Sequence, residues 1–140
     1  MNHEYENIIR LEIRSDKVSS DEMIERIGFT PDRTWQPGDL VNQKGLVKFK
    51  DHGCRVETSK IETDSWGQLF EDFSQFVEGL DVYKDALKKI SEHEDVKVSF
   101  VLIQYVKGAQ LGYRFGPKIL KKVADFGAEL SLDLYSLPTD

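Results

Sequence analysis

Residues 96–106 of the chain read Val96-Lys97-Val98-Ser99-Phe100-Val101-Leu102-Ile103-Gln104-Tyr105-Val106. Apolar side chains occupy both alternating sets of this run: Val98, Phe100 and Leu102 in one, and Val101, Ile103 and Tyr105 in the other. A strand that is apolar on both faces is typical of the interior of a sheet. The run therefore predicts a central strand around which the other elements are arranged.

The chain before this run predicts a half-exposed strand followed by a short helix. Alternate residues from Ile9 to Ile13 are apolar and the residues between them are charged, which is the period of a strand with one buried face. Ser19 and Glu22 fit a capping box at the start of the helix. Gly28 supplies the left-handed residue that ends it.

A β-hairpin and a pair of helices are predicted next. The runs Leu46 to Lys50 and Cys54 to Thr58 are strand-like and are joined by a turn-forming Asp-His-Gly sequence. Ser65 can cap the first helix, and Asp81 can cap the second. The first helix has a strongly aromatic face whose residues recur at the helical period: Leu69, Phe70, Phe73, Phe76, Val77 and Leu80.

The last part of the chain predicts a helix and a strand. Pro117 fits the first helical position and Gly127 fits the end. In the last strand we expect an inward-facing apolar set formed by Leu130, Leu132 and Leu134. This order of elements predicts an α+β single-domain sandwich, a largely antiparallel sheet with helices packed mainly on one face. The domain is expected to span residues 1–140, with its core at about 5–135.

A proline-bracketed segment follows the first helix and reads Gly28-Phe29-Thr30-Pro31-Asp32-Arg33-Thr34-Trp35-Gln36-Pro37-Gly38-Asp39. Together with the strand pattern before it and the Asp133-Leu134-Tyr135 ending, this segment resembles the small bacterial domain-of-unknown-function family 4279 (DUF4279). Pro31, Gly38 and Asp39 match the recurrent part of that family's pattern. The chain departs from the pattern at residues 53–59, where an aromatic residue is expected. The resemblance implies the fold and brings no catalytic residues with it.

Motifs for catalysis and for cofactors are scarce. The sequence contains neither a G-x-S-x-G nucleophile elbow nor a phosphate-binding loop. The three histidines have no helical i, i+4 pair, and His52-Gly53-Cys54 is the only cluster of His with Cys. Cys54 shares an alternation phase with Val56, which predicts a small buried thiol. We therefore expect no catalytic residues, no cofactor and no metal ligands.

The composition of the chain indicates the cellular compartment in which the protein is expected. No apolar run approaches the roughly 18 to 20 residues that cross a bilayer, and the N-terminus lacks the basic and apolar regions of a secretory signal. A single cysteine cannot form an intramolecular disulfide, as is usual in the cytosol. The sequence predicts a cytoplasmic protein with no membrane contact.

The charge pattern supplies the leading functional hypothesis. The formal charge is −6, and the segment Glu62 to Asp81 contains no Lys or Arg but six acids: Glu62, Asp64, Glu71, Asp72, Glu78 and Asp81. Glu71, Asp72 and Glu78 fall on the side of the helix opposite the phenylalanines, so they are candidate partner-binding residues. This pattern favours a non-catalytic protein-binding domain, for instance an immunity protein that covers a basic toxin enzyme. The alternative is a merely solubilising surface.

Three other readings remain open. The Pro31 to Asp39 loop could frame a small-ligand or catalytic pocket built from Arg33, Trp35 and Asp39, unless Trp35 simply closes one end of the core. The stretch Lys107 to Ala124 is five units positive, but the net acidity of the chain argues against nucleic acid as a partner. An exposed sheet edge would allow a homo-oligomer.

Overall fold

Strand β5 (Val96–Val106) lies between β1 (Tyr5–Ser15) and β6 (Glu129–Ser136), which confirms the central strand predicted from residues 96–106. The computed structural model describes residues 5–108 and 113–138. Its six-stranded sheet has the order β2-β3-β1-β5-β6, with β4 also paired to β1. The remaining strands are β2 (Arg33–Trp35), β3 (His52–Glu57) and β4 (Ile61–Thr63). All pairings are antiparallel except β5 with β6.

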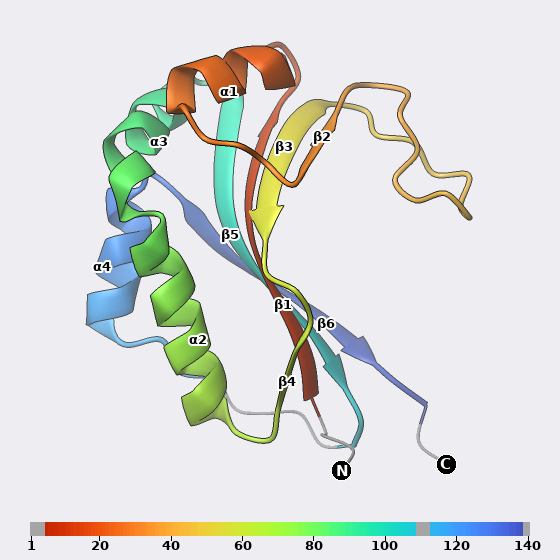
Figure 1. Cartoon of the computed structure of the whole chain (residues 1–140), viewed down its shortest axis with the longest axis vertical. Helices are drawn as coiled ribbons and strands as arrows, with labels where there is room; N and C mark the ends of the chain where they lie inside the picture. The colour runs from red at the N-terminus through yellow and green to blue at the C-terminus, as the bar shows by residue number, and fades with distance from the viewer. Residues whose placement is uncertain (1–4, 109–112, 139–140) are drawn as a thin grey trace.

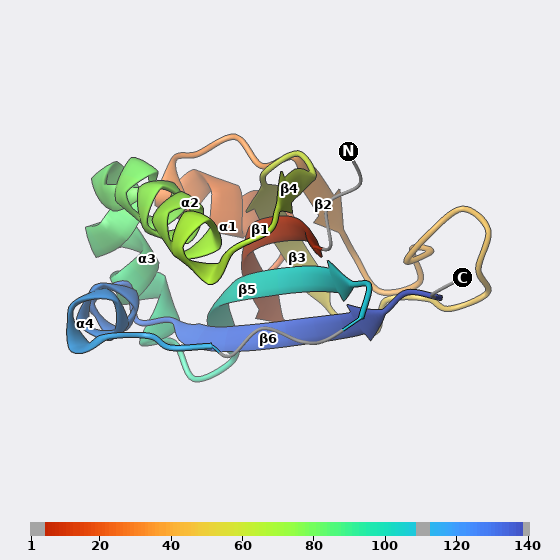
Figure 2. The ribbon, with the colours of Figure 1, turned by 90° about the horizontal axis from the view of Figure 1, so that it is seen from below.

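The helices gather on one side of this sheet, as Figure 1 shows and the turned view in Figure 2 confirms. They are α1 (Ser20–Ile27), α2 (Trp66–Gly79), α3 (Lys84–Ser91) and α4 (Pro117–Asp125), with a short 3-10 turn, η1 (Asp81–Tyr83), between α2 and α3. The α+β class with a largely antiparallel sheet is therefore confirmed. Because β5 and β6 are parallel, α4 lies in the crossover connection that such a pair requires.

One apolar core fills the space between the sheet and the helices. Alternate residues of β1 are buried, and Ile9, Leu11 and Ile13 face the helices beside Phe100 and Leu102 of β5. The helices contribute Met23, Leu69, Phe73, Leu87, Ile119 and Val123 to the same cluster. Burial of this apolar surface stabilises the fold by roughly 25 cal/mol per Å².

The helix boundaries follow the predicted caps. Ser19 Oγ accepts the N–H of Glu22 at 3.2 Å, and Gly28 ends α1 with a φ of 81°. Only half of the predicted capping box forms, because the Glu22 carboxylate pairs with Arg26 at 2.7 Å. Ser65 caps α2 by accepting the N–H of Gln68.

The predicted β-hairpin is wrong. β3 begins at His52 and pairs with β1 and β2, whereas the run Leu46 to Lys50 belongs to no strand of the sheet. That run folds back on residues 38–41 instead, and its Leu46 and Val47 side chains are 94% and 67% exposed. The edge of β3 is taken by β2, because Gly53 leaves room there for the Trp35 ring.

Two further predictions need correction. Leu132 and Leu134 of β6 lie on the helix side of the sheet, as predicted, but they are not buried: they are 39% and 37% exposed, because β6 is an edge strand that extends beyond the helix layer. Only Leu130, at the start of β6, packs against the core cluster. Asp81 does not cap a helix: it lies within η1, and its carboxylate is 3.7 Å from the amine of Lys84.

Candidate functional site

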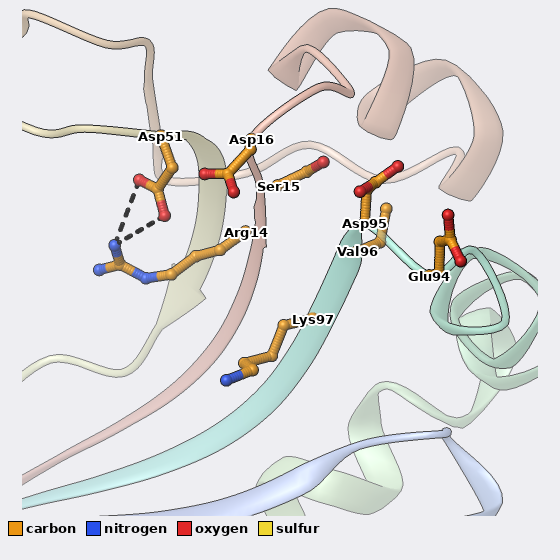
Figure 3. A pocket seen from close by; sticks show the side chains of 8 residues that line it. All are labelled: Arg14, Ser15, Asp16, Asp51, Glu94, Asp95, Val96 and Lys97. Atoms are coloured by element: carbon orange, nitrogen blue, oxygen red, sulfur yellow. Dashed lines mark hydrogen bonds and ion pairs between the residues drawn. The ribbon is translucent and has the colours of Figure 1, made fainter.

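An open hollow of about 370 Å³ lies at the end of the sheet where β1 finishes and β5 begins (Figure 3). We call it the charged hollow, because four acids and two bases are among its eight lining residues: Arg14, Ser15, Asp16, Asp51, Glu94, Asp95, Val96 and Lys97. Three parts of the chain form the lining: the end of β1, the residue just before β3, and the turn from α3 into β5.

The pair formed by Arg14 and Asp51 makes one wall of the charged hollow. Arg14 Nη1 lies 3.4 and 3.3 Å from the two carboxylate oxygens of Asp51. The indole N–H of Trp35 donates to Asp51 Oδ1 at 3.1 Å, so this carboxylate joins β1 to β2. The guanidinium carbon of Arg14 also lies 5.0 Å from the centre of the Trp35 ring, within the range of a cation–π contact.

The rest of the lining contains three carboxylates and one lysine. Asp95 pairs with Lys17 at 3.7 Å, and Lys97 pairs with Glu129 at 3.8 Å. Asp16 and Glu94 make no ion pair within the described part of the chain. In Figure 3 the carboxylates line one side of the hollow and Arg14 and Lys97 lie across from them. Such a site presents both signs of charge to a small polar molecule.

Residues 36–51, which we call the arm, project from the sheet between β2 and β3 (Figure 1). A short backbone ladder orders it: Gly38 N–H to Phe49 O at 2.9 Å, Phe49 N–H to Asp39 O at 2.8 Å, and Val41 N–H to Val47 O at 2.9 Å. At its base the Trp35 and Phe49 rings stack, with centroids 4.6 Å apart. A second hollow of about 340 Å³ separates the arm from Arg14 and Asp16.

The predicted ligand-binding residues all make contacts that stabilise the arm. Arg33 donates to the carbonyls of Leu40 and Val41, both at 2.7 Å. Asp39 Oδ2 accepts the N–H of Gln36 at 2.9 Å. Trp35 is 2% exposed, so its ring closes the base of the arm and reaches the charged hollow only through Asp51. The structure therefore brings Arg33, Trp35 and Asp39 together at the base of the arm.

The predicted acidic residues lie on α2, and their environments differ. Glu71 is exposed and makes no ion pair with the residues described. Asp72 Oδ1 accepts a hydrogen bond from Gln68 at 3.1 Å, while its Oδ2 is buried and has no hydrogen-bond partner. Glu78 accepts a hydrogen bond at 2.6 Å from Lys122 of α4, and this bond lowers the pKa of Glu78. Of these three acids, Glu71 thus presents the exposed carboxylate without an ion pair among the described residues, and the half-buried Asp72 lies beside it.

Lys122 belongs to the basic stretch Lys107 to Ala124, of which residues 109–112 lie outside the described residues. Part of the positive charge of this stretch therefore offsets the acidic helix.

Sequence reasoning missed the charged face of the sheet that no helix covers. Register places Glu12 opposite Arg55 and Arg10 opposite Glu57, and Arg10 forms a short hydrogen bond to Glu57. Burial, followed by the nearby Arg10, lowers the pKa of the Arg55 guanidinium. The alternating sequence of β1 predicts its outward-facing charged residues. It does not predict their ion-pair partners, because these lie on a strand more than forty residues away in the chain.

Cys54 lies on the opposite, helix-covered face of the sheet. It is fully buried, which confirms the predicted buried thiol, and burial raises the pKa of Cys54 to about 12. A thiol with so high a pKa is a poor nucleophile and metal ligand at neutral pH.

Residues 5–108 and 113–138 contain no group of three or more His, Cys, Asp or Glu residues that could hold a metal ion. They also contain no helix with the length and apolar character needed to cross a membrane.

The fold and these surfaces define a small α+β domain in which one sheet carries helices on one face and a network of charged side chains on the other. The chain belongs to the family described as Domain of unknown function (DUF4279), whose model matches residues 3–137. The resemblance drawn from the proline-bracketed segment is thereby confirmed. No curated protein and no solved structure matched the chain.

Proposed function

We propose that this protein is a non-catalytic, cytoplasmic domain that binds a basic protein partner through the acidic face of α2, in the manner of an immunity protein. The observation that carries the proposal is the pair of neighbouring carboxylates at Glu71 and Asp72 on a helix, Trp66–Gly79, that contains no Lys or Arg.

The face of α2 opposite these carboxylates is anchored in the core. Leu69, Phe73 and Val77 are fully buried in the core, so α2 can hold its outer face in place without ordering on binding. Preorganised charge speeds the association of an oppositely charged partner and weakens as salt screens it. Glu78 contributes less, because Lys122 already neutralises it.

The test is affinity capture from the native host, followed by binding measurements with each purified partner. The double variant Glu71→Lys/Asp72→Lys should bind at least about tenfold more weakly, with most of the loss in the association rate. The control Glu25→Lys/Glu92→Lys makes the same change in net charge at exposed positions of α1 and at the end of α3. Equal affinity of the two double variants for the partner would contradict the proposal.

A second candidate function is the binding of a small zwitterionic molecule in the charged hollow. It is favoured by the two signs of charge on the lining and by the hydrogen bond that links Trp35 to Asp51. The variant Trp66→Phe leaves Trp35 as the only tryptophan, so a ligand at Asp51 should change its emission.

Free amino acids and short peptides are suitable probes. Binding should shift Trp35 emission and raise the melting temperature by mass action. Arg14→Gln should abolish both effects, whereas Lys44→Gln on the arm should preserve them. A melting temperature that no probe changes would exclude this second candidate.

A further inference from the structure

Strand β6 (Glu129–Ser136) leaves one edge and part of one face uncovered. It pairs with β5 alone, so its outer backbone groups have no strand partner among the described residues. Leu132 and Leu134 project on the helix-covered side of the sheet, since they are in register with Leu102 and Gln104, but the described residues leave them 39% and 37% exposed. An open edge beside exposed leucines is a template for pairing with another strand.

The direction of the backbone groups along β6 can be deduced. The N–H of Leu137 donates to the carbonyl of Val106 at 2.8 Å, so this residue directs its backbone groups toward β5. Alternate residues of a strand direct these groups to opposite sides. Leu130, Leu132, Leu134 and Ser136 therefore direct their N–H and C=O groups outward, away from β5. The two exposed leucines, Leu132 and Leu134, are thus among the residues whose backbone groups point outward.

We propose that β6 pairs with β6 of a second copy of this chain, in an antiparallel dimer with a two-fold axis at Leu132. In this register Leu132 lies opposite Leu132 of the second copy, and Leu130 lies opposite Leu134. Each of these pairs exchanges both N–H···O=C bonds, because the outward-directed groups meet. The sheets of the two copies become one continuous sheet, and the exposed leucines cover one another.

The charged residues of β6 are compatible with this register and disfavour the registers that are shifted by one residue. Glu129 lies opposite Tyr135 of the second copy, and Asp133 lies opposite Ser131, so no like charges are directly opposed. Moving the axis to Asp133 would set two carboxylates directly opposite each other, which is destabilising. A slip by one residue in one strand would move its leucines to the other face relative to their partners.

The proposed interface lies at the edge of the sheet opposite the arm. The sheet order places β6 at one edge and β2, from which the arm leaves, at the other. Dimerisation would therefore leave the arm free. It also accounts for the leucine alternation in a strand that a single copy leaves half exposed.

The test is the molar mass of the full chain, measured by sedimentation equilibrium over a range of concentrations. The wild type should dimerise, and Leu132→Lys should be monomeric because it would bring two ammonium groups together at the axis. Leu120→Lys is the matched control: it removes a similarly exposed leucine from α4 and should leave the dimer intact. Circular dichroism and thermal unfolding of each variant establish that it is folded.

Cysteine variants test the register separately from the affinity. Residues in a hydrogen-bonded antiparallel pair have Cα atoms about 5.5 Å apart, a distance that a disulfide can span. Mild oxidation should therefore link Leu132→Cys into a covalent dimer much faster than Leu120→Cys. A wild type that stays monomeric, or equal cross-linking of the two cysteine variants, would overturn the proposal.

Discussion

Gly53 illustrates how one residue determines a packing contact on the sheet. It lies opposite Trp35 in the pairing of β2 with β3, and a Cβ atom placed on it would lie 2.2 Å from the indole ring. The absence of a side chain therefore lets the indole lie against β3, where it stacks on Phe49 and donates to Asp51. Because Gly53 has no side chain, Trp35 can contact the sheet, the arm and a residue of the charged hollow at the same time.

We expect Gly53→Ala to destabilise the protein by about 1–3 kcal/mol, because the Trp35 ring must move out of a fully packed position. Urea unfolding measures the loss, and a red shift of tryptophan emission reports the movement. Gly67→Ala is the control, since a Cβ there meets no atom within 4 Å. In α2 this control should be neutral or stabilising by up to ~1 kcal/mol. Equal stability of the two variants would contradict this account of Trp35.

The buried thiol of Cys54 predicts a pH dependence. Burial raises its pKa to about 12, whereas an unfolded cysteine titrates near about 8.5. The unfolded chain therefore releases the thiol proton first, and stability is lost as the pH rises from the lower value to the higher one.

Between pH 7.5 and 10, the wild type should lose roughly 2 kcal/mol of unfolding free energy relative to Cys54→Ala. Urea unfolding of both proteins at each pH measures the difference and removes the contribution of the other titrating groups. A difference that does not change with pH would contradict the burial of the thiol.

At the scale of elements, the arm is an ordered extension of the sheet. The three hydrogen bonds of its backbone ladder end at the stacked Trp35 and Phe49 rings, and Arg33 supports the arm through the carbonyls of Leu40 and Val41. A guanidinium is suited to this position, because its planar fork can donate to two neighbouring carbonyls at once. The proline-bracketed segment thus serves to orient the arm.

We expect Arg33→Lys to loosen the arm without unfolding the domain. An ammonium group cannot reproduce the planar two-carbonyl contact, so the amides of Val41 and Phe49 should exchange hydrogen at least about tenfold faster. Hydrogen exchange followed by NMR measures this change. The amides of β5 serve as the internal control and should keep their wild-type rates. Unchanged exchange at Val41 and Phe49 would show that the backbone ladder orders the arm without Arg33.

At the scale of the whole molecule, one aromatic centre joins the helices to the sheet. Phe100 of β5 is fully buried and contacts Phe73 and Phe76 of α2 and Phe126 at the end of α4. Their ring centroids lie between 5.2 and 6.3 Å from that of Phe100, in tilted or edge-on arrangements. Loss of this ring should weaken the packing of both α2 and α4 on the sheet, because Phe100 contacts both helices.

Phe100→Ala should therefore destabilise the protein by about 3–5 kcal/mol, the cost of a large cavity in a packed core. Val82→Ala, at an exposed position of η1, should change stability by no more than about 0.5 kcal/mol. Urea unfolding with several probes measures both values. A loss below about 1 kcal/mol for Phe100→Ala would contradict the single-core description.

The central strand, the helices, the caps at Ser19, Gly28 and Ser65 and the buried thiol of Cys54 could all be predicted from the sequence. These features depend on neighbours within a few residues, through side-chain period or a cap hydrogen bond. The helical period likewise places the acidic residues of α2 on an exposed face. It does not predict which of these carboxylates is neutralised by an ion pair. Lys122 lies 44 residues from Glu78, so only packing of α4 on α2 brings the two together.

Tertiary structure alone decided the partner of β3, the assembly of the charged hollow and the exposure of β6. The pairing of β3 with β2 depends on a close approach of Trp35 to Gly53, and the charged hollow requires Arg14 and Asp51 to meet across 37 residues. The leucines of β6 show the inward alternation of a buried strand, but burial also requires something to cover them. Local periodicity determines which face of a strand is apolar; only the positions of the other elements, or of a second molecule, determine whether that face is buried.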